Sequence, residues 1–162
     1  MEGRRTGTTL AASLLSPPTR SHPANNDLIA EALRLFGLSA EALDQRIPPA
    51  IAHAGADHLV LALRSRTLLR AMRYDFGVGR TLALRESIGT FSLIHAAEPQ
   101  LFHARNPFPI GGVYEDPATG AAAAALAGYL RDLCWPHSGA IEIIQGLRVQ
   151  AEARGVDPFA RG

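Results

Sequence analysis

Apolar residues recur at helical spacing just after an Asn-Asn-Asp run, and they predict the first helix of the chain. Across residues 28–36 they stand three and four positions apart, which places them on one helical face. Residues 25–27 offer N-cap side chains, and Gly37 is a residue type that commonly follows the end of a helix. Prolines interrupt residues 1–26, so we expect a loop there, with one strand within residues 10–15.

Short, continuous apolar runs further along the chain predict buried strands. Such runs do not alternate like a half-exposed strand, and they are shorter than a typical helix. They predict strands over residues 58–63, 91–95, 102–105 and 141–144. Between these strands we expect two short helical pieces, over residues 40–45 and 65–72.

An alanine-rich segment in the second half of the chain predicts a buried helix. Asp116-Pro117 should open it, because Asp is a good N-cap and Pro is favoured at the first helical position. Alanines fill positions 121–125 and 127, and we expect the helix to reach about Leu133. Small side chains allow close approach, so we expect neighbouring strands to wrap this helix. The whole pattern predicts an α+β fold with several strands around one Ala-rich helix.

Composition then excludes several classes of function. The 162 residues hold 16 basic and 15 acidic side chains, for a formal net charge of +1, which provides no overall field for nucleic acid or an anionic membrane. No apolar run approaches the roughly 18 residues of a membrane helix. Lysine is absent, which excludes Schiff-base chemistry on a lysine. The single Cys134 excludes an internal disulfide and a cysteine-rich zinc site, and it fits a cytoplasmic location.

A pair of histidines and a run of arginines could bind ligands, but we expect both groups to have structural roles. His53 and His58 are five positions apart with no recognisable third ligand, so we predict no metal site there. A basic run could bind phosphate, yet no aromatic residues interleave it, and we expect a solvated, salt-bridged face. This run comprises Arg64, Arg66, Arg70 and Arg73.

The segment most suggestive of chemistry is a glycine-rich turn with two carboxylates, Glu115 and Asp116, just before the alanine-rich helix. The first turn of a helix has free N–H groups and a partial positive charge, and it therefore binds carboxylate or phosphate well. Gly120 would let a ligand approach the backbone. In a purely structural alternative, Asp116 only caps the helix and Glu115 is solvated.

This same segment, Glu115–Ala121, reads Glu-Asp-Pro-Ala-Thr-Gly-Ala and resembles the signature of the PhzF-like (phenazine biosynthesis) family. Residues 102–109 are similar to the family's strand before that turn. Residues 54–61 and the later residues 144–146 also resemble family segments. The similarity covers about residues 8–146.

The resemblance implies a diaminopimelate-epimerase-like fold with two similar domains, each a curved sheet wrapped around a central helix. The active site would lie between them, where a glutamate shuttles a proton on a small carboxylic acid without metal or organic cofactor. Carried over by motif, Asp116 resembles the family's second active-site acid and is the candidate catalytic residue of this chain. Gly120 and Ala121 would hold the substrate carboxylate through backbone N–H groups, and Thr119 and Glu115 are further candidate substrate-binding residues.

The chain also departs from the family pattern. Ala121 stands where many relatives have serine, and the family's first domain, with its glutamate and Gly-His-Pro motif, is largely missing. We expect residues 1–26 to be an irregular remnant of that domain and residues 27–146 to be the C-terminal domain. Residues 147–162 form a divergent tail, for which a truncated gene, a frameshift or divergence are open explanations.

Two hypotheses of function follow. In the first, the protein is an isomerase or epimerase of the PhzF type, impaired in this chain because the proton-shuttling glutamate is not found. In the second, it is a non-catalytic binding or assembly module, or a degraded fragment that needs a partner. A homodimer or a complementing first domain would cover the apolar face left by the missing domain.

Overall fold

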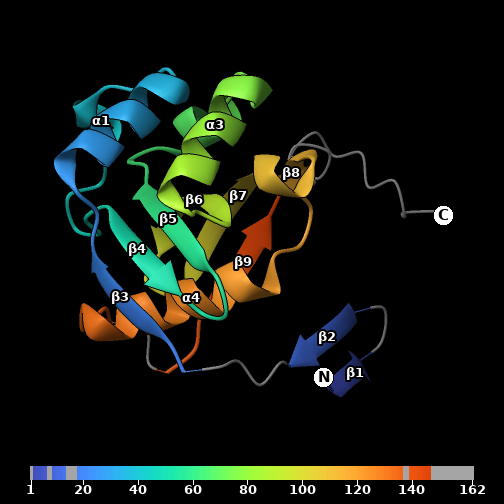
Figure 1. Ribbon diagram of the computed structural model, residues 1–162. Helices are drawn as coiled ribbons and strands as arrows, with labels where there is room; N and C mark the ends of the chain where they lie inside the picture. The colour runs from blue at the N-terminus through green and yellow to red at the C-terminus, as the bar shows by residue number, and fades with distance from the viewer. Residues whose placement is uncertain (1, 7–8, 14–17, 137–138, 147–162) are drawn as a thin grey trace, which may run out of the picture.

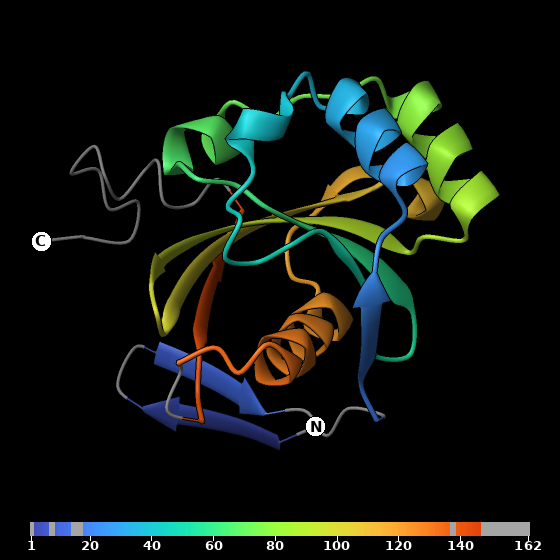
Figure 2. The same ribbon diagram turned by 90° about the vertical axis from the view of Figure 1, so that its left-hand side faces the viewer.

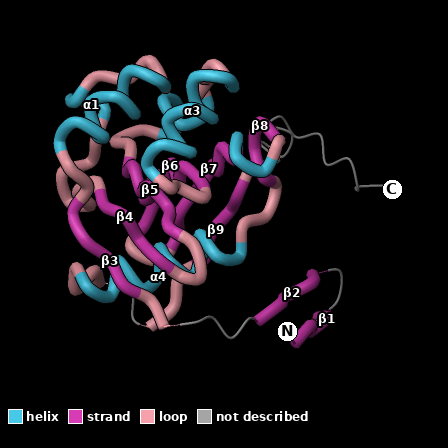
Figure 3. Tube along the Cα trace, viewed as in Figure 1, coloured by secondary structure: helices cyan, strands magenta, loops and turns pink. Residues whose placement is uncertain are grey.

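The computed structural model describes residues 2–6, 9–13, 18–136 and 139–146 (Figure 1). The predicted tail, residues 147–162, lies outside the described residues. The strands are β1 (Glu2–Thr6), β2 (Thr9–Ser13), β3 (Arg20–Pro23), β4 (Ala50–His53), β5 (Asp57–Ala62), β6 (Thr90–Glu98), β7 (Leu101–Phe108), β8 (Val113–Asp116) and β9 (Glu142–Gln145). The helices are α1 (Asn26–Leu35), α2 (Arg66–Arg70), α3 (Phe76–Glu86) and α4 (Gly120–Asp132), with short 3-10 turns η1 (Ala40–Ala42) and η2 (Pro109–Gly111) (Figure 3).

A mixed sheet forms the centre of the molecule. Its strands follow the order β3-β4-β5-β6-β7-β8, and β9 pairs with β7 as well. The β5–β6 and β7–β9 pairs are parallel, and the other pairs of this sheet are antiparallel. Strand β7 therefore contacts β6 along one edge and, along the other, both β8 and β9. This arrangement brings the end of β9 to the turn that follows β8.

Helices cover both faces of the sheet (Figure 2). α1, α2 and α3 lie over one face, and α4 packs against β3, β4 and β5 on the other. Side chains alternate between the faces along each strand. In β5, for example, Leu59 and Leu61 belong to the core under α1–α3, whereas Val60 and Ala62 belong to the core around α4. The curved sheet around an Ala-rich helix is thus confirmed.

Close packing around α4 depends on its small residues. Ala122 and Ala125 are buried, and Ala125 packs with Leu130 in the α4 core. A Cβ on Gly128 would lie 2.5 Å from the Cβ of Thr19, in the segment that leads into β3. The absence of a side chain at Gly128 therefore lets this segment run directly over the helix.

The prediction of a loop over residues 1–26 is wrong. β1 and β2 pair with each other as an antiparallel hairpin, and β2 overlaps the one strand expected in residues 10–15. β3 pairs with β4, from Arg20 opposite His53 to Pro23 opposite Ala50. Proline is tolerated at the end of such an edge strand because the side of the backbone that lacks the N–H can face solvent and not a second neighbouring strand. The pattern of β3 is polar, so sequence periodicity gives no signal for it.

The alanine-rich helix begins later than predicted. It starts at Gly120, with Thr119 at the N-cap, and not at Asp116-Pro117. Asp116 instead ends β8, where it lies opposite Asn106 of β7. Strand pairing with β7 overrides the local preference of an Asp-Pro pair for a helix start. Residues 117–119 consequently form a short connection between a strand and a helix.

Candidate functional site

Strand β8 is fastened to the helical layer by a pair of tyrosines. The backbone N–H of Tyr74, just before α3, donates to the hydroxyl of Tyr114 at 2.8 Å. The Tyr74 hydroxyl donates in return to the Tyr114 carbonyl, and the two rings stack with centroids 4.3 Å apart. Burial raises the pKa of Tyr74, so this donor stays protonated. The two residues thereby fix the strand that leads into the predicted site.

Asp116 closes the connection between β8 and α4. One carboxylate oxygen, Oδ1, accepts a hydrogen bond from the backbone N–H of Ala118 at 3.2 Å. The other, Oδ2, accepts one from the hydroxyl of Thr119 at 2.8 Å. Short-range bonds of this kind are the usual way in which Asp stabilises a turn. The structure thus brings Asp116 and Thr119 together through a turn, and Asp116 does not act as the N-cap of the helix.

Gln145, at the end of β9, holds this turn from the other side. Its Nε2 donates to the carbonyl of Asp116 at 2.7 Å and to the hydroxyl of Thr119 at 3.1 Å. Its Oε1 accepts from the backbone N–H of Thr119 at 3.1 Å. Sequence reasoning did not include Gln145 among the site residues. The Gln-Gly pair at the end of a predicted strand was the available signal.

The turn presents the beginning of α4 to solvent. Gly120 and Ala121 are both exposed, and they occupy the first two positions of a 13-residue helix. Their backbone N–H groups have no intrahelical acceptor, because the first turn of any helix leaves its N–H groups unpaired. The N–H of Thr119 is already occupied by Gln145. Two adjacent donors at the positive end of the helix dipole are therefore available to an anion.

Glu115 does not face this anion-binding surface as a free carboxylate. It accepts from Nε and Nη2 of Arg105, at 3.0 and 2.7 Å, and both side chains are largely buried. Nη1 of Arg105 donates to the carbonyls of Leu69, Arg70 and Met72 at the end of α2. The alternative in which Glu115 is solvated is therefore wrong. Its geometry is that of a residue that joins β8 to α2.

His53 and His58, the pair weighed as metal ligands, each have a local partner through Nδ1. His53 Nδ1 lies 2.6 Å from an oxygen of Asp57. His58 is buried, its Nδ1 is hydrogen-bonded to the hydroxyl of Thr90 at 2.8 Å, and burial lowers its pKa to about 4. Among the residues that the structure describes, no group of three or more His, Cys, Asp or Glu side chains is placed to hold a metal ion.

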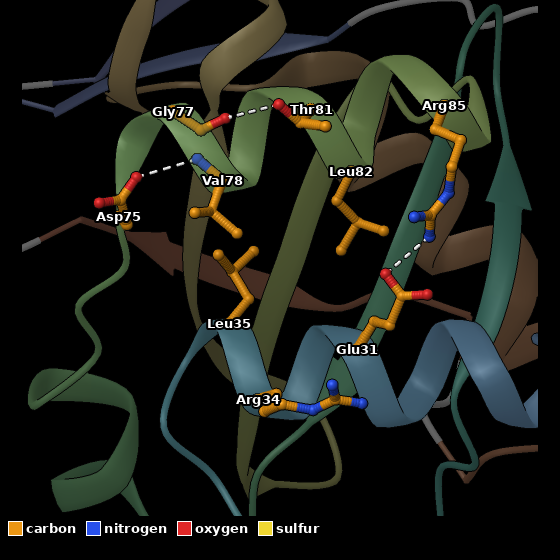
Figure 4. A pocket seen from close by; sticks show the side chains of 9 residues that line it. All are labelled: Glu31, Arg34, Leu35, Asp75, Gly77, Val78, Thr81, Leu82 and Arg85. Carbon is orange, nitrogen blue, oxygen red and sulfur yellow. Dashed lines mark hydrogen bonds and ion pairs between the residues drawn. The ribbon is translucent and has the colours of Figure 1, made fainter.

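A cavity of about 570 Å³ lies elsewhere, between α1 and α3 (Figure 4). Leu35, Val78 and Leu82 line it, and an ion pair between Glu31 and Arg85, 2.7 Å long, spans one end. This cavity is on the face of the sheet opposite α4. Its acid–base pair is already neutralised, so we place the candidate site at the start of α4, where donors are free.

These features define a class of protein: an α+β sheet wrapped around a small-residue helix whose first turn is exposed to solvent. The chain belongs to the phenazine biosynthesis-like (PhzC-PhzF) family, whose family model matches residues 1–154. The fold is similar to that of a PhzF-family phenazine biosynthesis protein from Bacillus anthracis, at a TM-score of 0.59 and 18% identity over 71% of this chain and 40% of that one. It is also similar to a predicted epimerase from Pseudomonas aeruginosa, at a TM-score of 0.57 and 22% identity over 82% and 45%.

The chain thus spans less than half the length of the two solved chains that it matches. A search of curated proteins finds no significant match. Within the described residues, none of the helices combines the length and the hydrophobicity needed to cross a membrane.

Proposed function

We propose that residues 27–146 form the carboxylate-binding half of a PhzF-type isomerase or epimerase, which moves a proton on a small carboxylic acid without a cofactor. One observation carries the proposal: the exposed N–H groups of Gly120 and Ala121, which have no acceptor within their own helix, lie beside Asp116, in a turn held by Gln145. Membership of the family supports it.

In this proposal the helix start binds the substrate carboxylate, and the reacting carbon lies next to it. Removal of a proton from that carbon shifts negative charge onto the carboxylate, where the two N–H groups and the helix dipole stabilise it. The proton then returns to the same carbon on its other face, or to another carbon of the substrate. Asp116 is positioned to hold or donate a proton at the edge of this site.

A second acid has to complete the reaction. Glu115, the nearest carboxylate in sequence, is held by Arg105 and is not available for proton transfer. We propose that a homodimer partner or a complementing first domain supplies the missing acid. General acid–base catalysis contributes about 10²–10⁴-fold, so residues 1–162 alone should show weak or no turnover. The purified chain would contradict this expectation if it catalysed stereospecific exchange of a substrate hydrogen with D₂O, and if Asp116→Asn abolished that exchange.

Carboxylate binding can be tested without knowledge of the natural substrate. We expect benzoate to raise the melting temperature of the chain and its neutral analogue benzamide to leave it unchanged. Gly120→Pro should remove the benzoate effect because proline lacks the N–H. It should also keep the fold, since proline suits the first helical position and Thr119 before it is already extended, at φ −102° and ψ 90°.

Gly120→Ala is the matched control, because alanine keeps the N–H and favours the helix. It should retain the benzoate effect. A benzoate response that is equal in Gly120→Pro and Gly120→Ala would place carboxylate binding elsewhere and would reject the proposal.

The alternative function, as a binding or assembly module, is supported by exposed hydrophobic side chains that a partner could cover. Val78 and Leu84 lie on α3, and Val113 and Tyr114 lie on β8. Light scattering during gel filtration separates the cases. A well-behaved monomer argues against this alternative, whereas a dimer that Val113→Ser converts to monomer, and that shows no benzoate effect, supports it.

A further inference from the structure

Two arginines of the basic run lie on one side of the short helix α2. Arg66 and Arg70 are four positions apart, which places their side chains one above the other on the helix. α2 packs against β6 and β7, on the face of the sheet opposite α4. Both side chains are half-buried, and Nη2 of Arg66 and Nε of Arg70 are buried without a hydrogen-bond partner among the described residues. The expectation of a salt-bridged face is therefore wrong at these two positions.

A buried histidine adds a third unpaired group. His103 of β7 is only 7% exposed, and its Nδ1 has no hydrogen-bond partner within the part of the chain that the structure describes. Phe102 and Ala104 point into the α4 core, so the alternation of the strand directs His103 toward α2. His95, its cross-strand neighbour on β6, is already hydrogen-bonded through Nδ1 to the carbonyl of Leu63 at 2.9 Å.

The charges of this group are close enough to influence one another. Burial lowers the pKa of His103, and the positive charge of Arg66 lowers it further, with smaller contributions from His95 and Arg70. Burial also lowers the pKa of Arg66, as does its neighbour Arg70. A buried donor without an acceptor is costly, and like charges in contact add to that cost.

The neighbouring Arg105 provides a comparison, because it is a buried arginine whose donors are paired within the protein. Its Nη1 bonds three carbonyls, and its Nε and Nη2 bond Glu115. Arg105 is hydrogen-bonded to the end of α2, whereas Arg66 and Arg70, on the same helix, each have a buried N–H donor without a partner among the described residues. A multivalent anion would satisfy these donors together, because guanidinium groups and phosphate oxygens form strong, paired hydrogen bonds.

We propose that Arg66, Arg70 and His103 form a binding site for a phosphate group, carried either by free phosphate or by a phosphomonoester. The site is separate from the start of α4, since it lies on the other face of the sheet. Three donors from two elements suit a tetrahedral anion with several oxygens better than a carboxylate, which a single arginine can pair. The proposal does not depend on the proposed isomerase function.

The test measures binding of inorganic phosphate at constant ionic strength, by ³¹P line broadening and by thermal melting. We expect saturable binding to the full chain. Arg66→Gln and Arg70→Gln should each weaken it about tenfold or more, since a hydrogen bond between charged groups contributes about 1.5–3 kcal/mol. Arg73→Gln, an exposed residue of the same basic run, is the control and should bind as the unmodified chain does.

The variants also separate a binding role from a structural one. Without phosphate, Arg66→Gln and Arg70→Gln should melt no earlier than the unmodified chain, because they remove unpaired buried donors. Glycerol phosphate in place of inorganic phosphate distinguishes the sources: tighter binding of the ester indicates a phosphorylated metabolite, and tighter binding of phosphate indicates the free ion. No saturable binding, or equal loss in Arg73→Gln, would overturn the proposal. Gly120→Pro removes a donor at the start of α4 and leaves α2 unchanged, so phosphate binding that persists in Gly120→Pro and is lost in Arg66→Gln belongs to the arginine site, and the two proposed sites can fail separately.

Discussion

Single buried side chains determine how this protein responds to acid, and His58 is the clearest case. It is 2% exposed, and its Nε2 has no hydrogen-bond partner in the described part of the chain. Protonation would place a buried charge on β5, between β4 and β6. Burial therefore holds the pKa of His58 at about 4, against about 6.5 in an unfolded chain.

This pKa difference predicts acid destabilisation over a defined range. Between pH 6.5 and 4 the unfolded chain binds a proton at position 58 and the folded chain does not, so the free energy of unfolding decreases as the pH falls. The loss from this residue should be on the order of 3 kcal/mol by pH 4. Melting curves of His58→Asn should be less sensitive to pH in this range. His22→Asn, at an exposed position of β3, is the control, and equal sensitivity in all three proteins would contradict the prediction.

Arg105 is the residue whose loss should cost the most stability. It is 6% exposed and links the end of α2 to Glu115, next to the candidate site. Removing one partner of a buried ion pair costs about 3–5 kcal/mol. We expect Arg105→Met to lose stability in this range in urea unfolding, and Arg105→Met with Glu115→Met to lose less, because the carboxylate is no longer left unpaired. A double variant less stable than Arg105→Met would show that the pair is not coupled in this way.

At the scale of elements, the glycines of two helices have opposite roles. A Cβ on Gly128 of α4 would collide with Thr19, whereas a Cβ on Gly77 of α3 would meet only Asp75 Oδ1 at 3.4 Å. Alanine is about 1 kcal/mol better than glycine inside a helix when space allows. We therefore expect Gly77→Ala to raise the melting temperature and Gly128→Ala to lower it. Stabilisation by Gly128→Ala would mean that the Thr19 segment moves away without cost.

The elements that sequence predicted are those with strong local signals. α1 was predicted from its apolar spacing, its Asn-Asn-Asp start and Gly37. In the structure Asn25 caps the helix, accepting from the N–H of Leu28 at 2.8 Å, and Gly37 follows it with φ +64°. α3 was missed because Gly77 and Gly79 weaken its pattern. It is held instead by the cap at Asp75 and by packing of Gly79 against the Tyr74 ring. β3 and β4 were missed because they are held by strand pairing, of β3 with β4 and of β4 with β5, which is not visible locally.

The site shows the same division between local and distant signals. The motif located Asp116, Thr119, Gly120 and Ala121, which are neighbours in sequence. Gln145 could not be predicted as a site residue from the motif. It follows α4 in the sequence, and the parallel pairing of β9 with β7 places it beside the turn. The role of Glu115 was likewise hidden, since its partner Arg105 lies on the strand before it. The motif therefore identifies a segment of the sequence, but strand pairing determines which of its side chains are already hydrogen-bonded to other parts of the protein.

For the whole molecule, β7 separates two proposed binding sites. Its residues alternate between the α4 face and the α2 face, so one strand borders both the start of α4 and the arginines of α2. Arg105 on β7 and Glu115 on β8 connect the two sides through their ion pair. The chain spans less than half of its solved relatives, and we propose that the missing acid of the isomerase reaction faces the start of α4 from another domain or subunit.

The central claim is that the start of α4 binds a carboxylate through backbone N–H groups. The most direct measurement is a benzoate titration of the ¹⁵N-labelled chain followed by amide NMR. The account predicts saturable shifts that are largest at Gly120 and Ala121 and absent with benzamide. Saturable shifts centred on another segment, or none at these two amides at saturating benzoate, would contradict it.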